Sequence, residues 1–415
     1  MSSRPGVATR VDENGRARRR SIARSLAAVL GIAALALGGA RALSPYKPWR
    51  QMGIFAPADR IRNFRAMNEI FPVRSIPRST HPHVFDSRPV ALPSTFLYQA
   101  QERKLDELLE RTVTTGFLVL KENAVLSERY FRGATADAPL TSWSVAKSVV
   151  SLLVGIAHDE GLMPDLDAPL ARYAPELEGS DYGRVPVRAA LDMSSGIDFR
   201  EDYRDPLSDI HTMFARLFLM GGHGESVGHY LASRRRDAEP GTRFRYESSD
   251  TLAVGLALRH ATGMPLAEYL ERKLWQPLGM EYAATWNVED GEGVELAFCC
   301  LNVRLRDYAK IGRLAARGGD WDGQRIVSAS WLEESTRVDP KRAPGTIPGM
   351  SVGYTHFWWL SPGNRGTFMA RGVWGQFIYV NPTKQVVIVK TSVDPDFMQN
   401  AEETHAAFGA IDAAL

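Results

Sequence analysis

A serine and a lysine stand three residues apart in the stretch TSWSVAKSVVSLLVGIAHDEG, which runs from Thr141 to Gly161. On a helix, residues at this spacing share one face, so the side chains of Ser144 and Lys147 come within reach of each other. The neighbouring residues are apolar almost all round, and burying an unpaired ammonium is costly. We therefore expect Lys147 to be paired with acceptors or to have a lowered pKa. An amine in that state can activate a serine hydroxyl as a nucleophile.

The predicted nucleophile would lie at the N-terminus of this helix. Free backbone N–H groups and the positive end of the helix dipole at that point suit an oxyanion that develops during acyl transfer. The spacing S-x-x-K is a weak signal by itself, because it occurs again from Ser44 to Lys47, where Pro45 excludes a helix. Alone, the pair is also compatible with a helix-start serine beside a lysine whose stem lies along apolar surface.

A second serine competes for the role of nucleophile. The run GESVG from residue 224 to 228 fits G-x-S-x-G, the pattern that places a serine on a sharp strand-to-helix turn in α/β-hydrolases. The residues before it read as a helix rather than as a β-branched strand, and the residues after it are polar. This context favours a loop serine at Ser226 over a nucleophile.

The elements that would position these residues follow a definite order. A helix is expected over LDELLERT, and TGFLVLKENAVLSERYF predicts a hairpin that turns at residues 121–123. A long helix from Ser142 follows, and a later one is expected to be capped by one of residues 248–250. Near the end, GVWGQFIYVNPTKQVVIVKTS reads as two strands joined at residues 381–384. Strands at both ends with helices between them predict an α+β domain, whose antiparallel sheet is closed by its first and last strands.

Size and composition allow one large domain or two. The chain has 415 residues, of which 44% are hydrophobic and 24% charged, as is usual for a globular protein with a sizeable core. The net charge of +2 is unevenly distributed, because residues 1–42 hold eight arginines against Asp12 and Glu13, a charge of +6 that leaves −4 for the remainder. Nucleic-acid binding needs basic residues clustered on the folded part, so we expect no nucleic acid as partner.

The N-terminus is typical of an export signal. The stretch RRRSIARSLAAVLGIAALALGGARAL has a basic start, an apolar run from Leu26 to Ala40 and then an A-x-A pattern, which predicts a signal peptide over residues 1–42. The apolar run has 15 residues, fewer than the ~20 of a spanning helix, although its flanks could extend it into an uncleaved membrane anchor. The run RRSI resembles a twin-arginine signal loosely. We expect an exported protein, periplasmic or otherwise extracytoplasmic, which this segment could attach to the inner membrane.

The remainder divides into a lead-in and a main domain. Residues 43–95 are rich in proline and arginine with few periodic apolar patterns, so they predict an extended lead-in before a domain over residues 96–415. Cys299 and Cys300 are adjacent, and disulfide geometry needs well separated Cα atoms, so we interpret them as two small buried residues without a disulfide. The histidines of HPH at 81–83 lack further ligands at suitable spacing, and we expect no metal and no other cofactor.

Several further motifs accompany the serine and lysine in an order that is similar to one known family. TSWSVAKS resembles the family's nucleophile motif, and LDMSSGIDF, PGTRFRYESSD, WQPLGM and GVWGQFIYVNP resemble its later motifs in their usual order. Over most of residues 60–410 the chain resembles the serine β-lactamase and penicillin-binding-protein superfamily, above all its branch of class C β-lactamase-related esterases and 6-aminohexanoate-dimer hydrolases. The resemblance implies a β-lactamase/transpeptidase-like form of the α+β fold, with helices flanking the sheet and an inserted helical region.

The resemblance also implies roles for individual residues. Ser144 would be the acylated nucleophile, and Lys147 its base or proton relay. Tyr246, in the run YES, matches the family's Y-x-N/S motif and would pass a proton to the leaving group, with Ser248 lining the site. A phenol titrates near ~10, so Tyr246 needs a nearby cation to act as a base, which Lys147 could supply. Tyr203 matches a tyrosine that the amide-cleaving branch places over its pocket. Without the resemblance, these tyrosines are compatible with a core position and an exposed loop.

The third motif departs from that of the β-lactamases. Where they carry K-T-G, this chain has Val373-Trp374-Gly375, followed by Gln376. A glycine at the end of an edge strand still lets substrate approach the backbone, so Trp374 and Gly375 are expected to bind substrate. The N–H groups of Ser144 and Gln376 would form the oxyanion hole. The lysine that would meet a substrate carboxylate is missing, which argues against true β-lactamase activity.

These features predict a metal-independent serine hydrolase that acts on a small-molecule ester or amide through an acyl-enzyme intermediate. A carboxylesterase or a 6-aminohexanoate-oligomer hydrolase fits best, and a β-lactamase or D-amino-acid peptidase is the alternative of the same class. A non-catalytic, penicillin-binding-like sensor domain is an alternative of another class. Such sensor domains typically lose the serine, lysine or tyrosine that this chain retains.

Overall fold

The computed structural model describes residues 46, 48–219, 226–289, 293–337, 353–361 and 366–415. The chain divides into two units, Met1–Arg50 and Gln51–Leu415, and the fold below is that of the second. The predicted signal peptide or anchor over residues 1–42 lies outside the described residues. Among the residues that are described, no helix is both long enough and apolar enough to cross a membrane.

The main sheet has eight strands. Their order is β12-β13-β14-β15-β16-β5-β6-β2, and every neighbouring pair is antiparallel except β2 with β6. The bounds are β2 Asp86–Ser87, β5 Thr114–Lys121, β6 Ala124–Tyr130, β12 Gly353–Thr355, β13 Trp358–Leu360, β14 Phe368–Gly372, β15 Gln376–Asn381 and β16 Val386–Ser392.

Both predicted hairpins form. β5 and β6 turn at residues 122–123, and β15 and β16 turn at 382–385, where β-branched and aromatic residues give way to proline and polar residues. β16 pairs with β5, with Val389 opposite Leu118. The first long strand therefore lies beside the last one, which confirms the predicted α+β fold with an antiparallel sheet closed by N- and C-terminal strands.

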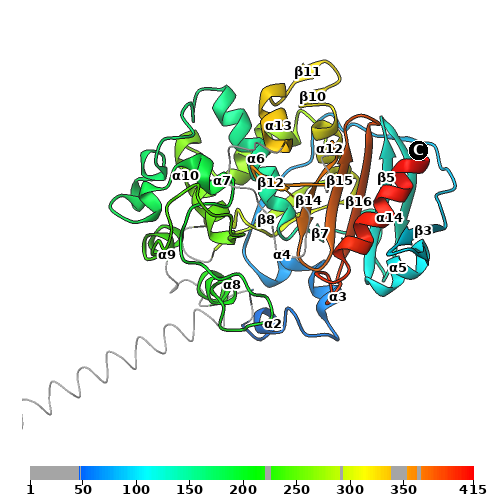
Figure 1. Ribbon diagram of the computed structural model, residues 1–415, viewed down its shortest axis with the longest axis horizontal. Coiled ribbons are helices and arrows are strands. Elements are labelled where there is room, and N and C mark those ends of the chain that lie inside the picture. The colour runs from blue at the N-terminus through cyan, green and yellow to red at the C-terminus, as the bar shows by residue number, and fades with distance from the viewer. Residues whose placement is uncertain (1–45, 47, 220–225, 290–292, 338–352, 362–365) are drawn as a thin grey trace, which may run out of the picture. The chain divides into compact units, whose positions relative to one another are not determined.

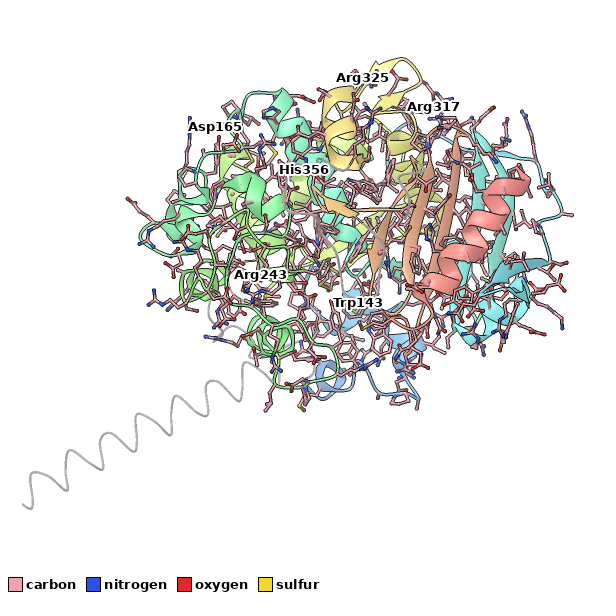
Figure 2. All side chains as sticks on the ribbon, in the orientation of Figure 1. Trp143, Asp165, Arg243, Arg317, Arg325 and His356 are labelled. Carbon is pink, nitrogen blue, oxygen red and sulfur yellow. A yellow bond between two sulfur atoms is a disulfide. The ribbon has the colours of Figure 1, made fainter. Side chains whose placement is uncertain are left out.

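Helices cover both faces of this sheet. Successive residues of a strand point to opposite faces. On β15, Phe377 meets Phe408 of α14 (Ala401–Ala414) with ring centroids 5.6 Å apart. The next residue, Ile378, lies against Gly312 of α12 (Leu305–Ala316) on the other face. Figure 1 shows α14, in red, in front of the sheet.

The inserted helical region is built around α6 (Val145–Asp159), whose residues from Val145 to Ala157 are all buried. α6 packs against α10 (Ser248–Thr262), which begins after Glu247. Further α-helices of the described residues are α5 Leu105–Arg111, which forms where LDELLERT predicted a helix, α7 Val187–Leu191, α8 Asp209–Phe214, α9 Val227–Ala232, α11 Leu266–Leu270 and α13 Ala329–Thr336. A glycine allows the packing of α13, since a Cβ on Gly155 would lie 2.5 Å from the indole of Trp331.

A second antiparallel sheet, β1-β8-β9-β7, supports the start of α6. Its strands are β1 Val73–Ile76, β7 Leu140–Thr141, β8 Ala284–Asn287 and β9 Leu301–Val303. Beside the β7–β9 pair, the N–H of Ser142 donates to the carbonyl of Leu301 at 2.8 Å, and the N–H of Leu301 donates to Ser142 Oγ at 3.0 Å. These bonds fix Ser142, two residues before Ser144, against Leu301.

The segment that we expected to be an extended lead-in is folded. α2 (Pro48–Met52) spans the boundary of the two units, and α3 (Arg60–Asn63), α4 (Met67–Ile70), β1 and β2 follow. Ile54, Phe64 and Phe71 are buried in the core. The expectation of an extended segment was wrong because four-residue helices are too short to show an apolar period. The remaining strands form two small hairpins, β3 Thr95–Tyr98 with β4 Gln101–Lys104 and β10 Asp320–Trp321 with β11 Gln324–Arg325.

Candidate active site

Ser144 lies at the N-terminus of α6. It is the N-cap residue of that helix and is 7% exposed. The residue before it, Trp143, has φ of +43°, a conformation that non-glycine residues adopt rarely. Such strain is retained only where the surroundings enforce it, and it gathers at functional sites. In the part of the chain that the structure describes, the Ser144 N–H donates to no acceptor, so it is free to meet a ligand.

Lys147 is buried beside this serine. Its Nζ lies 3.0 Å from Ser144 Oγ, 3.0 Å from Ser248 Oγ and 3.0 Å from the carbonyl oxygen of Phe298. Burial lowers the pKa of Lys147 to about 8, although the nearby Glu201 carboxylate raises it. In mildly alkaline solution the amine of Lys147 is therefore largely neutral and can accept a proton, whereas the amine of a surface lysine is still charged.

Tyr246 approaches the same two side chains. Lys147 Nζ lies 5.1 Å from the centroid of its ring, and the ring packs on Tyr354 and Trp359. Burial and Glu201 raise the pKa of Tyr246, while a hydrogen bond with Ser144 and the charge of Arg371 lower it. Because the raising effects dominate, the phenol stays protonated at neutral pH and can donate a proton.

A carboxylate that we did not select from the sequence completes the polar side of the site. Glu201 accepts hydrogen bonds from the N–H of Ser248 at 2.6 Å, from Ser248 Oγ at 2.9 Å and from the hydroxyl of Tyr203. It lies in the run EDY, two residues before Tyr203. A carboxylate two residues before a pocket tyrosine was the available signal, but a loop contact with the start of α10 cannot be inferred from spacing.

A cavity of about 400 Å³ opens onto Ser144. Of the predicted site residues, Ser144, Tyr203, Ser248 and Trp374 line it, whereas Tyr246 reaches Ser144 from beside the cavity. Seven of the eighteen residues that line it are aromatic, namely Phe55, Trp143, Tyr203, Phe214, Phe298, Trp374 and Phe397. Polar residues also line it, among them Arg204, His211 and Asp396. The cavity suits a ligand with an apolar body and one reactive polar group.

The beta-lactamase family model matches residues 102–409. The chain belongs to the beta-lactamase family. The 6-aminohexanoate-dimer hydrolase of Paenarthrobacter ureafaciens is 34% identical over 310 residues, which are 70% of this chain and 76% of that protein. A Bacillus anthracis protein assigned as a 6-aminohexanoate-dimer hydrolase has a TM-score of 0.77 at 23% identity, over 86% of this chain and 95% of its own. A penicillin-binding protein homologue from Caulobacter crescentus has a TM-score of 0.54 at 16% identity, over 69% and 90%.

These similarities confirm the predicted fold and family. The chain is a hydrolase of the beta-lactamase fold and is similar to 6-aminohexanoate-dimer hydrolases. The two solved structures support the fold alone, because both are less than 25% identical to this chain.

One aromatic residue of the cavity wall, Phe55, precedes residues 102–409, which the family model matches. Phe55 stacks on Trp143 and on Trp374 with centroid distances of 5.8 Å each. The guanidinium of Arg60 lies 4.8 Å from the ring of Trp374, a cation–π contact. We missed Phe55 in the sequence because nothing local links it to residues some 300 positions later.

The structure changes the assignment of the third motif of this hydrolase. The glycine that passes closest to the nucleophile is Gly372, since a Cβ there would lie 3.1 Å from the Ser144 nitrogen. Gly375, which we expected to serve this purpose, lies against Lys390 and Ser392 instead. The motif therefore ends at Gly372, so Ala370-Arg371-Gly372 stands where the β-lactamases carry K-T-G. Ala370 occupies the position of the lysine, and the basic residue Arg371 is one position later.

Gln376 does not line the cavity, contrary to its expected place in the oxyanion hole. Its side-chain amide donates to the carbonyls of Val373 and Ser392, at 3.2 and 2.8 Å, and holds the 373–376 turn against the sheet. Val373, directly after Gly372, does line the cavity. Its N–H donates to no acceptor in the described part of the chain.

The two cysteines form a disulfide, which corrects our expectation. Cys299 and Cys300 are bonded to each other across a turn in which Cys300 has φ of +66°. Our argument from Cα separation does not hold here, because the turn brings the two sulfur atoms together although the Cα atoms are only 3.8 Å apart. Both residues are buried, as we expected, and Cys299 contributes to the cavity wall.

The competing serine has a structural role. Ser226 is the N-cap of α9, and its hydroxyl accepts a hydrogen bond from the N–H of His229 at 3.2 Å. It does not line the cavity that holds Ser144. The contact is that of an ordinary helix cap.

Proposed function

We propose that this hydrolase cleaves a linear amide or ester through an acyl-enzyme formed on Ser144. The observation that carries the proposal is the buried contact of 3.0 Å between Lys147 Nζ and the Oγ of Ser144, a residue that lines an apolar cavity. An amine whose pKa is about 8 is neutral in a substantial fraction of molecules near that pH, where an ordinary lysine is almost fully charged, and the neutral amine can accept the serine proton.

In the acylation step, Ser144 Oγ attacks the substrate carbonyl carbon while its proton passes to Lys147 Nζ. The resulting oxyanion needs preorganised N–H donors about 3 Å away. The free N–H of Ser144 is one such donor, and the free N–H of Val373 is the second in place of Gln376. The absence of a side chain at Gly372 lets these two peptide groups approach each other.

Tyr246 then supplies the proton that the leaving group requires. Its phenol is protonated at neutral pH, and it borders both Ser144 and Lys147. An amine leaving group must be protonated as the C–N bond breaks, whereas an aryl oxide can leave without a proton. Lys147 returns its proton through Tyr246, and water releases the acyl group by the same steps in reverse.

The cavity and the similarities point to a linear substrate with an apolar chain. The relative from Paenarthrobacter ureafaciens is named for hydrolysis of the 6-aminohexanoate dimer, an amide. The aromatic residues of the wall offer contact to a methylene chain, and the charged side chains of Arg204 and Asp396, which also line the cavity, can meet polar ends of a substrate. We therefore propose amides of ω-amino acids or similar linear acyl compounds as the substrate class. β-Lactams and D-amino-acid peptides are the alternative substrate classes.

Labelling and hydrolysis together test this proposal. We expect a fluorophosphonate to add once to the wild-type protein and to Ser226→Ala, and not to Ser144→Ala, as read by intact mass and peptide mapping. The three proteins are then assayed on 6-aminohexanoate dimer, a nitrophenyl ester, a chromogenic cephalosporin and a D-alanyl peptide. Absence of an adduct on wild-type Ser144 and of turnover on all four would overturn the proposal and favour a binding module.

We also propose export of the protein, directed by residues 1–42. The support is the order of basic, apolar and A-x-A segments in that stretch. Expression of the full chain in a bacterial host, followed by fractionation and N-terminal sequencing, separates the outcomes. Cleavage after residue 42 indicates a signal peptide, an intact N-terminus in the membrane fraction indicates an anchor, and an intact soluble cytoplasmic chain would contradict export.

A further inference from the structure

The hydrogen bonds around Ser248 have a fixed direction. A serine hydroxyl has one proton to donate. Glu201 carries two acceptor oxygens, of which one accepts the N–H of Ser248 at 2.6 Å and the other accepts its hydroxyl at 2.9 Å. Since the hydroxyl proton is directed to the carboxylate, Ser248 Oγ can only act as an acceptor toward Lys147, whose Nζ lies 3.0 Å away.

This direction decides how the neutral amine of Lys147 is arranged. A neutral lysine amine has two N–H donors and one lone pair. The acceptors Ser248 Oγ and the Phe298 carbonyl, each 3.0 Å from Nζ, use both donors. The lone pair is left for the third neighbour, Ser144 Oγ, also at 3.0 Å. That is the orientation in which the amine can accept the nucleophile's proton.

We propose that Glu201 is a positioning residue, which orients the Ser248 hydroxyl and thereby turns the lone pair of Lys147 toward Ser144. This inference rests on the proposed function, because it assigns a cause to the orientation of the proposed base. Glu201 itself contacts Ser248 and Tyr203 and does not touch the nucleophile among the described contacts.

Neighbouring carboxylates do not share this arrangement. Glu247, the residue before Ser248, accepts from Ser195 and Arg245. Asp250, in the first turn of α10, accepts from the hydroxyl of Tyr182. Neither accepts from the Ser248 hydroxyl in the described structure, so the direction of that hydroxyl depends on Glu201.

The substitution Glu201→Gln tests the proposal. A glutamine can direct its NH₂ group at Ser248 Oγ, which frees the hydroxyl proton to point at Lys147 and occupy the lone pair. Misdirection of a reacting group costs on the order of 100-fold in rate, so we expect kcat to fall between about 10- and 100-fold, with KM within about threefold. Thermal unfolding checks that the variant is folded, and Glu201→Asp should recover part of kcat.

The pH profile separates this role from a merely structural one. In the wild type, kcat/KM should rise with pH through the pKa of Lys147, which is about 8. Lys147 faces Glu201 and the phenol of Tyr246, and Arg371 faces Tyr246. Removal of the Glu201 charge favours the neutral amine, so the acidic limb should move to lower pH while the plateau falls. A purely structural loss would lower the plateau without that movement.

A double-mutant cycle with Ser248→Ala identifies the route of the effect. If Glu201 acts through the Ser248 hydroxyl, Glu201→Gln should cost less than about twofold in kcat when Ser248→Ala is already present, yet should still shift the acidic limb. Additive losses in kcat, or a Glu201→Gln single variant with a wild-type plateau and limb, would overturn the inference. Failure of the proposed function differs, because wild-type Ser144 would then resist the fluorophosphonate.

Discussion

Two buried serine–lysine pairs occur in the described structure, and only one of them opens to a cavity. Lys147 and Lys390 are each 1% exposed, and each amine is hydrogen-bonded to a serine hydroxyl, Ser144 and Ser392 respectively. Burial lowers the pKa of Lys147 to about 8 and that of Lys390 to about 7. By the state of the amine alone, the pair on β16 is the better candidate.

The surroundings of the two pairs differ. Ser144 stands at a helix N-terminus with a free N–H, beside a phenol and a cavity of about 400 Å³. Ser392 and Lys390 lie inside the main sheet, where the adjoining cavities measure about 10 Å³ each, room for one water at most. A lowered amine pKa is therefore a common result of burial. It contributes to catalysis only where a substrate can enter and an oxyanion can be stabilised.

The largest expected effect separates the two lysines directly. Lys147→Met should lower kcat/KM on the best substrate by about 10³- to 10⁴-fold, because it removes the general base. Lys390→Met, a matched loss of a buried amine, should change kcat/KM by less than about threefold. Steady-state kinetics on the two variants, with circular dichroism as a fold control, provides the measurement. A larger loss from Lys390→Met than from Lys147→Met would reverse the assignment.

The second effect concerns the phenol, which the Lys390 pair lacks. Tyr246→Phe removes the proton donor for the leaving group and should reduce amide hydrolysis by about 10²-fold. Hydrolysis of a nitrophenyl ester should fall by less than about tenfold, because a nitrophenolate leaves without a proton. The ratio of the two losses, measured as kcat/KM on one preparation, is the readout. Equal losses on both substrates would show that Tyr246 serves another step.

The sequence predicted the parts of this site that local geometry determines. Ser144 and Lys147 lie on one helix, so the helical period places them together. The strands of the two hairpins follow from their apolar and turn residues, and the two-residue spacing of Tyr246 and Ser248 belongs to one motif. These elements and their order were sufficient to predict the fold.

Contacts between distant segments could not be predicted in the same way. Phe55 contacts Trp374, and Glu201 contacts Ser248, because several loops fold back onto the N-terminus of α6. Gly372 and Gly375 are three residues apart, and only the pairing of β14 with β15 decides which one faces Ser144. The Cys299–Cys300 disulfide depends on the backbone of a turn rather than on residue type.

The pH dependence of folding stability tests the Lys390–Ser392 pair, which adjoins no substrate-sized cavity in the described structure. The pKa of Lys390 is about 7 in the folded protein and its usual value is 10.5, so between these values the unfolded chain binds more protons. Folding stability from this group therefore rises as pH rises from about 7, by up to ~1.4 kcal/mol per pH unit, and is lowest below pH 7. Lys390→Met removes this dependence.

We expect the wild type to gain ~2 kcal/mol in unfolding free energy relative to Lys390→Met between pH 7.5 and 9.5. Urea unfolding at both pH values gives the difference, and subtracting the variant cancels the opposing titrations of Glu247 and Asp250, whose pKa values are raised by burial. Lys104→Met, at an exposed residue, serves as the control: its unfolding free energy should differ from that of the wild type by the same amount at both pH values. If the difference between the wild type and Lys390→Met is also the same at both pH values, the amine of Lys390 is charged in the folded wild type.

The smallest effect concerns access, the property that distinguishes the Ser144 pair most clearly. Phe55 forms the wall between Trp143 and Trp374, so Phe55→Ala removes aromatic contact that a substrate chain would use. A lost aromatic contact of roughly 1 kcal/mol corresponds to about fivefold. We expect KM for the linear substrate to rise by about fivefold, while kcat stays within about twofold because the polar groups around Lys147 are untouched.

Met52→Ala is the matched control for this change. Met52 lies three residues before Phe55. Met52 is 69% exposed and does not line the cavity. KM for Met52→Ala should equal that of the wild type within error. If both variants raise KM alike, the N-terminal part of the unit acts through its folding rather than through contact of Phe55 with substrate. A kcat that falls with KM unchanged in Phe55→Ala would show instead that the aromatic wall supports Trp143 and the conformation of Ser144.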